Sequence, residues 1–370
     1  MLVLGYDVGT SAIKATLLDA ETGTVQASAR APMGEELSME PPPRLGRAVP
    51  KALVEGGTGG DGEAPGRGRL RARRRHGHRP HVPNARARPR RRESRGLAPG
   101  TSVTYRAGDQ PNNAFSLNVL DSGEVAATAG TSGVIYGVGD TPEYDSQSRV
   151  NTFLHVNHEP ETRPRYGTLM CVNGTGILNR WLHDTLAGAD SLSYERMNEE
   201  AAQAPIGTEG LTVLPFGNGA ERTLGNRDLG ASVHGLNFNV HNRAHLLRAA
   251  QEGIVFALRY GLDIMRDMGL SADTIRAAHG NMFLSPVFAE AFATVTDTTV
   301  EIVHTSGAAG AARGAGVGVG LYESPKEAFE GLDLVDTVTP STEQAAPYAA
   351  AYDRWHHLLT HQLNAPSDHA

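Results

Sequence analysis

The sequence predicts an α/β protein, and three patterns along its 370 residues carry this prediction. Short apolar runs typical of strands alternate with segments in which apolar residues recur at helical spacing. One such segment covers residues 243–268 and predicts a long helix that ends at Gly269. Two turns rich in Gly, Thr and Ser each separate a pair of strand-like runs. Strands that alternate with helices form a sheet with helices on its faces.

Residues 1–35 predict a small antiparallel sheet. Three strand-like runs follow one another, separated by the turn-forming residues 8–11 and 21–23. The runs are LVLGYDVG, IKATLLDA and TVQASARA. Together they predict a meander of two hairpins.

Residues 96–365 predict a compact α/β domain, and residues 366–370 form a tail. The spacing of apolar residues defines four further strands and five further helices in this domain. The strand-like runs are 124–130, 133–139, 274–280 and 299–305, and the helical runs are 177–188, 194–204, 285–296, 308–321 and 343–363.

The segment 36–95 differs in composition from the rest of the chain. Residues 41–100 contain 15 Arg and one Lys against four acidic residues, a net charge of +12. The other 310 residues contain 18 basic and 37 acidic residues, a net charge of −19. Arg, Gly, Pro and Ala make up 42 of the 60 residues in 41–100. Such a composition buries too little apolar surface to offset chain entropy, so we expect disorder.

Two interpretations of this segment stay open. Its four dominant residue types have codons made mostly of G and C, as an out-of-frame translation of GC-rich DNA would produce. The other interpretation is a basic arm that binds nucleic-acid phosphates, although such arms usually contain Lys interleaved with Ser or aromatic residues. The charge of −19 on the rest of the chain disfavours a nucleic-acid partner.

Cysteine content and hydropathy exclude other classes of protein. The single cysteine, Cys171, excludes an internal disulfide framework, and its apolar neighbours indicate a buried core thiol. No run approaches the roughly 20 apolar residues of a membrane helix, and the N-terminus has no basic leader. We therefore expect a cytoplasmic protein with no membrane partner. The sequence is compatible with a homodimer and does not define the oligomeric state.

The first motif that carries chemistry is Asp7-Val8-Gly9-Thr10-Ser11-Ala12-Ile13-Lys14, at the end of the first strand. Asp7 can orient a divalent cation through water. Gly9 allows a tight turn, so that Thr10 and Ser11 approach phosphate oxygens. The alternative is an ordinary acidic β-turn that contains a glycine.

The second motif, Gly130-Thr131-Ser132-Gly133, repeats this chemistry between two further strands. Either turn alone is a weak signal. Two of them, each between successive strands, are expected if two similar domains face one nucleotide. The pair points to the actin-like ATPase (ribonuclease H-like) fold, in which duplicated hairpins hold a triphosphate from opposite sides.

At these motifs the sequence resembles the FGGY carbohydrate kinases, and most closely the xylulose kinases among them. The resemblance covers residues 1–35 and 96–365, and Gln251 departs from it because an apolar residue is expected there. The segments that carry it are Asp7–Lys14, Thr128–Gly133, Phe216–Arg222, Ala231–Leu236 and His245–Gly253.

The resemblance implies an enzyme that transfers the γ-phosphoryl group of ATP, with Mg²⁺, to a sugar hydroxyl. It implies that Asp109 is the catalytic base, because the attacking hydroxyl must give up its proton as the oxygen–phosphorus bond forms. Gln110, Asn112 and Asn113 would contact the sugar. The alternative for this segment is an Asx-turn in a loop.

Further residues are assigned to ATP and Mg²⁺ by the resemblance. Asp7 would hold Mg²⁺ through water, and the phosphates would meet a set of turn residues and one lysine. On the adenine side, Gly280 would supply a permissive backbone, and Asn281 or Met282 would contact the base. The glycines of 307–320 would pack a helix closely against the ATP cleft. The phosphate set is Gly9, Thr10, Ser11, Lys14, Gly130, Thr131, Ser132 and Gly133.

The N-terminal domain expected from the resemblance is truncated in this chain. The family's Met-His-Gly and Trp-x-Asp-x-Arg segments, both substrate-facing, have no counterpart. We therefore expect that the first three strands have lost the helices and strands that should cover them, and that this small meander is marginally stable unless it docks elsewhere. The implied reaction is D-xylulose to D-xylulose 5-phosphate with impaired activity. The alternatives are a noncatalytic nucleotide-binding remnant and an FGGY kinase for another ketose or polyol.

Overall fold

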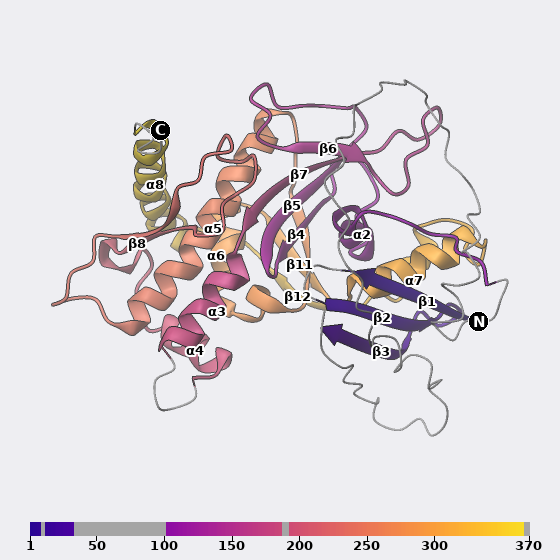
Figure 1. Cartoon of the computed structure of the whole chain (residues 1–370), viewed down its shortest axis with the longest axis horizontal. Coiled ribbons are helices and arrows are strands. Elements are labelled where there is room, and N and C mark those ends of the chain that lie inside the picture. Colours follow the sequence, from indigo (N-terminus) through magenta and orange to yellow (C-terminus); the bar gives the residue numbers. More distant parts are fainter. Residues whose placement is uncertain (9–11, 33–100, 187–191, 366–370) are drawn as a thin grey trace, which may run out of the picture. The chain divides into compact units, whose positions relative to one another are not determined.

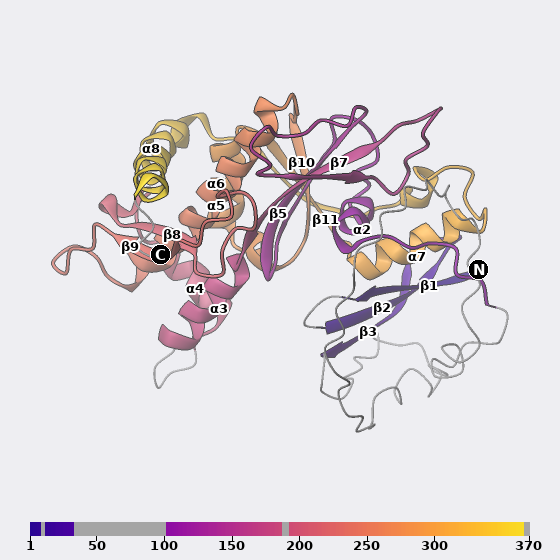
Figure 2. The same ribbon diagram turned by 45° about the horizontal axis from the view of Figure 1, so that its top comes forward.

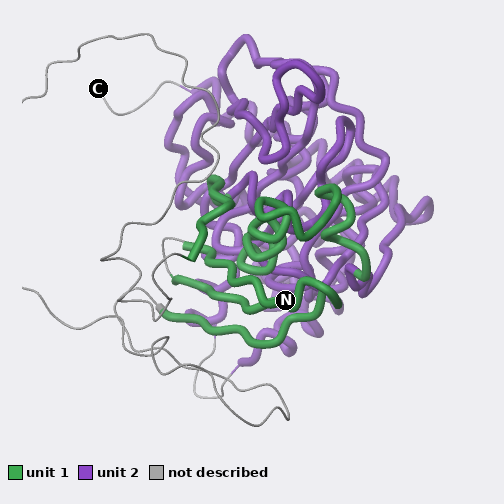
Figure 3. Tube along the Cα trace, turned by 90° about the vertical axis from the view of Figure 1, so that its right-hand side faces the viewer, with its two compact units in different colours: residues 1–109, 307–331 green, residues 110–306, 332–370 purple. Residues whose placement is uncertain are grey.

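The computed structural model describes residues 1–8, 12–32, 101–186 and 192–365 (Figure 1). The segment 36–95 and the tail 366–370 lie outside the described residues. The chain divides into two compact units, shown in different colours in Figure 3. Unit 1 comprises Met1–Asp109 and Gly307–Gly331, and unit 2 comprises Gln110–Ser306 and Leu332–Ala370. The domain limits drawn from the sequence stay a prediction.

Unit 1 contains the predicted meander. Strands β1 (Leu2–Val8), β2 (Ala12–Asp19) and β3 (Val25–Pro32) form an antiparallel sheet in that order. The register pairs Asp7 with Lys14 across the first hairpin. Sequence reasoning therefore placed all three strands correctly.

Helix α7 (Gly307–Gly318) packs against β1, and Figure 2 shows the two side by side. The backbones approach so closely that a Cβ on Gly5 would lie 2.1 Å from the carbonyl oxygen of Ala308. A small apolar cluster lies at this contact and consists of Val3, Leu18, Ala20 and Ala312. The loss of the N-terminal helices and strands that should cover this meander stays a prediction, and α7, from a later part of the chain, packs on β1 and β2.

A mixed sheet of seven strands forms the centre of unit 2, in the order β12-β11-β10-β4-β5-β7-β6. Strands β4, β10 and β11 are parallel, and the other pairs are antiparallel. The bounds are β4 Val125–Ala129, β5 Ser132–Gly139, β6 Asn151–Leu154, β7 Tyr166–Asn173, β10 Thr274–Ala278, β11 Thr299–Val303 and β12 Leu334–Val338.

Helices α5 and α6 cover one face of this sheet, and α8 packs on these two helices (Figure 1). All three helices contribute to the largest apolar core. Alternate residues of β4, such as Val125 and Ala127, point into that core, whereas Ala126 points to the opposite face. Helix α2 supplies Ala114 to the core on the opposite face. The bounds are α2 Asp109–Ser116, α5 Arg243–Asp267, α6 Pro286–Thr296 and α8 Thr342–Asn364.

Helix α5 contains 25 residues and begins at a capping box. The side chain of Asn242 accepts from the backbone N–H groups of Ala244 and His245, which have no partner within the helix. The helix ends two residues before Gly269, whose φ of 96° no helical residue adopts. The long helix predicted from the sequence is therefore confirmed at both ends.

Several elements were missed or misassigned. Strands β6, β7 and β12 were not predicted, nor was the two-stranded sheet of β8 (Thr212–Phe216) and β9 (Gly230–His234). The Asx-turn alternative for Asp109 is wrong, because Asp109 begins helix α2 and Pro111 lies in its first turn, where proline is tolerated. Cys171 is buried in the core beneath α2, as predicted.

Candidate functional site

The turn between β4 and β5 is the best-defined part of the candidate site. Gly130 and Thr131 connect the two strands, and Ser132 and Gly133 begin β5. The Thr131 side chain is exposed, and Ser132 is half-buried. Both residues therefore keep surface that is accessible to solvent.

Helix α3 (Thr175–Leu186) braces this turn. The carbonyl oxygen of Gly130 accepts from the Thr175 hydroxyl at 2.9 Å and from the Gly176 backbone N–H at 2.8 Å. A Cβ on Gly176 would lie 2.4 Å from that oxygen, so glycine is needed for the close approach. The turn is thereby held against the first turn of a helix.

Asn281, a predicted adenine contact, borders the same turn. It begins the short 3₁₀ helix η3 (Asn281–Leu284), two residues after the end of β10. The side-chain amide nitrogen of Asn281 lies 3.4 Å from the position that a Cβ on Gly130 would take. Met282 is buried in the main core, so of the two predicted base contacts only Asn281 borders the turn.

The backbone at this point differs from the prediction. Gly280 has a φ of 163°, which is extended backbone that any residue adopts, so it supplies no special conformation. The left-handed residue is Asn281, with a φ of 54°. Asparagine tolerates this conformation better than most residues. The residue that needs an unusual backbone conformation is therefore Asn281, one residue later than predicted.

In unit 1, Asp7 and Lys14 lie opposite each other near the end of the first hairpin. Lys14 Nζ lies 3.8 Å from Asp7 Oδ2, and the Asp7 side chain is 14% exposed. Gly9, Thr10 and Ser11 lie outside the described residues. Within the described parts of the chain, no three His, Cys, Asp or Glu side chains gather to hold a metal ion. A single carboxylate suits Mg²⁺ that keeps its waters and binds phosphates.

The predicted catalytic base and sugar-contacting residues share one helix. Asp109 begins α2 and is exposed, and a carboxylate is favoured at this end of a helix. Helical spacing places Asn112 and Asn113 on the same face as Asp109, three and four residues later. Asn112 is 5% exposed, whereas Gln110 and Asn113 are half-buried. Asn112 is therefore the least accessible of the four to a sugar.

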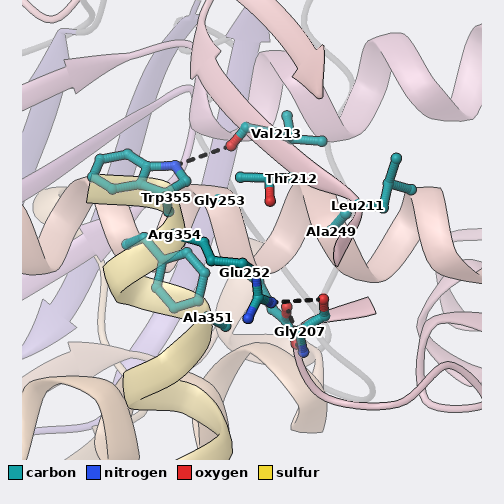
Figure 4. A pocket seen from close by; sticks show the side chains of 11 residues that line it. Gly207, Leu211, Thr212, Val213, Ala249, Glu252, Gly253, Ala351, Arg354 and Trp355 are labelled. Atoms are coloured by element: carbon teal, nitrogen blue, oxygen red, sulfur yellow. Dashed lines mark hydrogen bonds between the residues drawn. The ribbon is translucent and has the colours of Figure 1, made fainter. Parts of the chain in front are cut away.

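Two hollows in unit 2 are lined by other residues. One, shown in Figure 4, lies beside Glu252, Arg354 and Trp355 and has a volume of about 10 Å³, room for at most one water. The other has a volume of about 430 Å³ and lies at the starts of β4 and β10, beside Val125, Thr274 and Arg276. The β4–β5 turn follows the opposite end of β4. Neither hollow is lined by a predicted site residue.

Sequence reasoning missed the role of Thr175 and Gly176. The signal was available, because Gly174-Thr175-Gly176 is a third glycine- and threonine-containing turn that directly follows a strand. Because strand β7 was not predicted, this turn was not recognised as one that follows a strand. The contact between Thr175 and Gly130, 45 residues apart, appears only in the folded chain.

The sheet order, the strand-to-helix turns and the helices on the sheet are those of about half of an actin-like ATPase fold. The chain belongs to the FGGY family of carbohydrate kinases, because the profile of that family's C-terminal domain matches residues 125–319.

Individual relatives agree with this assignment. The chain is 30% identical over 272 residues to the xylulose kinase of Haemophilus influenzae, covering 72% of this chain and 52% of that protein. It is 27% identical over 279 residues to the gluconokinase of Bacillus licheniformis, covering 73% and 52%. The chain thus spans about half the length of the curated relatives it matches.

Solved structures show the same fold. The xylulose kinase from Rhodospirillum rubrum matches with a TM-score of 0.64 and 24% identity, over 74% of this chain and 54% of that one. The Plasmodium falciparum glycerol kinase with ADP matches with a TM-score of 0.60 and 21% identity, over 70% and 51%. None of the helices in the described residues is both long and apolar enough to span a membrane.

Proposed function

We propose that the chain binds ATP with Mg²⁺ and transfers the γ-phosphoryl group to a hydroxyl of a ketopentose. The observation that carries this proposal is the β4–β5 turn of an FGGY chain, braced by Thr175 and Gly176 and bordered by Asn281. A glycine turn with exposed hydroxyls and backbone N–H groups is suited to phosphate oxygens. Adenine would lie on the Asn281 side of the turn.

Each residue has a defined part in the proposed reaction. Asp109 accepts the proton of the sugar hydroxyl while that oxygen bonds to the γ-phosphorus and the bond to the bridging oxygen of ADP breaks. Thr131 and Ser132, together with Thr10 and Ser11, bind phosphate oxygens. Asp7 would hold Mg²⁺ through water, and the ion would offset phosphate charge.

D-Xylulose, phosphorylated at O5, is the proposed acceptor. Xylulose kinases are among the relatives, including those of Haemophilus influenzae and Bacillus subtilis at 30% and 27% identity. Gluconokinases lie at similar identity, so D-gluconate is the second candidate. We expect turnover below that of a full-length kinase, because the missing segments would orient the sugar.

A second candidate function is nucleotide binding without catalysis. Two observations support it. The chain covers only about half of each relative's length. It nevertheless retains the β4–β5 turn, which is proposed to bind phosphate. This alternative predicts binding of ATP without phosphorylation of any sugar.

Calorimetric titration with MgATP, followed by an ADP-release assay, tests both functions. The assay compares D-xylulose, D-gluconate, glycerol and no acceptor. Asp109→Asn is expected to reduce ADP release about a hundredfold or more and to leave MgATP affinity unchanged. The matched control is Asp140→Asn, an exposed aspartate at the end of β5. Binding without ADP release on any acceptor would favour the noncatalytic alternative, and no MgATP binding would refute both.

The other expectations stay predictions. We propose a cytoplasmic protein whose partner is a small sugar, and a homodimer is tested by sedimentation of the purified chain. A nucleic-acid partner is disfavoured. Duplex-DNA binding that weakens steeply with salt and is lost on deletion of residues 36–95 would reverse that view.

A further inference from the structure

One side chain, that of Thr175, contacts both sides of the β4–β5 turn. Its hydroxyl donates to the carbonyl oxygen of Gly130 at 2.9 Å. Its methyl carbon lies 2.5 Å from the position that a Cβ on Gly133 would take. Thr175 is fully buried, whereas Gly130 is half-buried. The Thr175 hydroxyl therefore holds the turn at Gly130, and the Thr175 methyl group packs against it at Gly133.

The hydroxyl can be removed without leaving a buried polar atom unpaired. The Gly130 oxygen also accepts from the Gly176 backbone N–H at 2.8 Å. Valine has nearly the shape of threonine, but it would place a methyl group where the hydroxyl now donates. Because a methyl group needs more distance from a carbonyl oxygen than a hydrogen-bonding hydroxyl does, the turn would shift away from α3.

We propose that Thr175 is a positioning residue for phosphate binding. It fixes the backbone at Gly130, and that backbone sets the direction of the Thr131 and Ser132 hydroxyls and N–H groups. A turn ordered before the ligand arrives avoids the cost of ordering on binding. The inference rests on the proposed nucleotide site and extends it to a residue that does not touch the nucleotide.

Three variants of the full chain separate positioning from plain stability. Thr175→Val removes the hydroxyl and keeps the shape, whereas Thr175→Ser keeps the hydroxyl. The matched control is Thr223→Val, because the buried Thr223 hydroxyl also donates to a backbone carbonyl, that of Cys171 in β7, which lies outside the turn. Each variant is titrated with MgADP, and hydrogen exchange of the turn amides is measured without nucleotide.

For Thr175→Val we expect about a three- to tenfold higher Kd for MgADP, the effect of one hydrogen bond. Exchange at Thr131–Gly133 should become faster. Thr175→Ser should restore most of the affinity, and Thr223→Val should change neither quantity. An unchanged Kd for Thr175→Val, or an equal loss in Thr223→Val, would overturn the proposal. If the wild-type chain binds no MgADP, the proposed function fails, and unchanged exchange in Thr175→Val would then separately refute the bracing role.

Discussion

Gln251 and Ser285 are joined by a buried hydrogen bond of 2.8 Å, in which the Ser285 hydroxyl donates to Gln251 Oε1. Gln251 lies within α5 and is 2% exposed, and its amide nitrogen also donates to Asn198 of α4, residues Tyr194–Ala201. Ser285 caps α6 and directly follows η3, which begins at Asn281. The residue that departs from the family pattern thus joins three helices beside the candidate adenine side.

Replacing Gln251 with leucine is expected to destabilise the chain by about 1–2 kcal/mol, because Ser285 and Asn198 lose their buried partner. Urea unfolding of the wild-type chain, Gln251→Leu, Ser285→Ala and the double variant gives the coupling free energy between the two residues. We expect a coupling energy of about 1 kcal/mol. Additive effects would show that the hydrogen bond contributes nothing.

Glu252 and Arg248 form a buried ion pair in α5, at 2.8 Å. Burial raises the pKa of Glu252, an effect that the guanidinium and the Gly207 backbone N–H oppose. Figure 4 shows Glu252 beside Gly207. Glu252→Gln would leave Arg248 charged without a counter-ion, so we expect a loss of about 3–5 kcal/mol in unfolding free energy.

The control for this variant is Glu199→Gln, which breaks an exposed pair with Arg196 on α4. Its effect should stay below about 1 kcal/mol. If Glu252→Gln costs as little as Glu199→Gln, then Glu252 is protonated in the native chain.

Acid is expected to destabilise unit 2 through His155. Burial lowers the pKa of His155 from 6.5 to about 4. Its Nε2 faces the Val119 carbonyl, so that nitrogen carries the proton, and Tyr136 O–H donates to Nδ1. The folded state thus binds its proton at lower pH than the unfolded state, so stability falls as the pH drops from 6.5 towards 4.

The loss from this one group reaches about 3 kcal/mol below pH 4. Urea unfolding between pH 7 and 4 measures it. His155→Gln should flatten the pH dependence in this range, and His357→Gln, at an exposed position of α8, should leave it unchanged. An equally steep dependence in His155→Gln would assign the effect to other groups.

Gly5→Ala tests the packing of α7 on β1. The new methyl group would lie 2.1 Å from the Ala308 carbonyl oxygen and 2.3 Å from the Ala312 nitrogen, both of which are backbone atoms. We expect a loss of about 2–3 kcal/mol in unit 1, with earlier proteolysis of residues 1–32. Gly139→Ala, whose Cβ has an ordinary contact of 3.7 Å, should be tolerated. Equal tolerance of both changes would show that α7 does not restrain β1.

The coding DNA across codons 36–100 decides between the two interpretations of the arginine-rich segment. If the segment is read out of frame, a shifted frame should encode the Met-His-Gly or Trp-x-Asp-x-Arg segments. Translation of all three frames after resequencing measures this directly. Their absence from every frame would instead identify a genuine basic segment and weaken the kinase proposal.

The sequence by itself determined the strongly periodic elements and the positions of the two predicted phosphate-type turns. Strand β4, the 25-residue helix α5 and the turn Gly130–Gly133 depend on local periodicity, capping and glycine content, which neighbouring residues carry. The family signature likewise lies in short contiguous segments, so the FGGY assignment was available before the fold.

The tertiary structure alone decided how distant segments support one another. Asp109 begins a helix and not a turn, and that helix packs Ala114 into the core on one face of the sheet. Gly5 has no side chain and therefore allows α7, from a distant part of the sequence, to pack closely on β1. Thr175 donates to Gly130, which lies 45 residues earlier in the sequence. These contacts depend on the distance between backbones after folding, which local residue patterns do not encode.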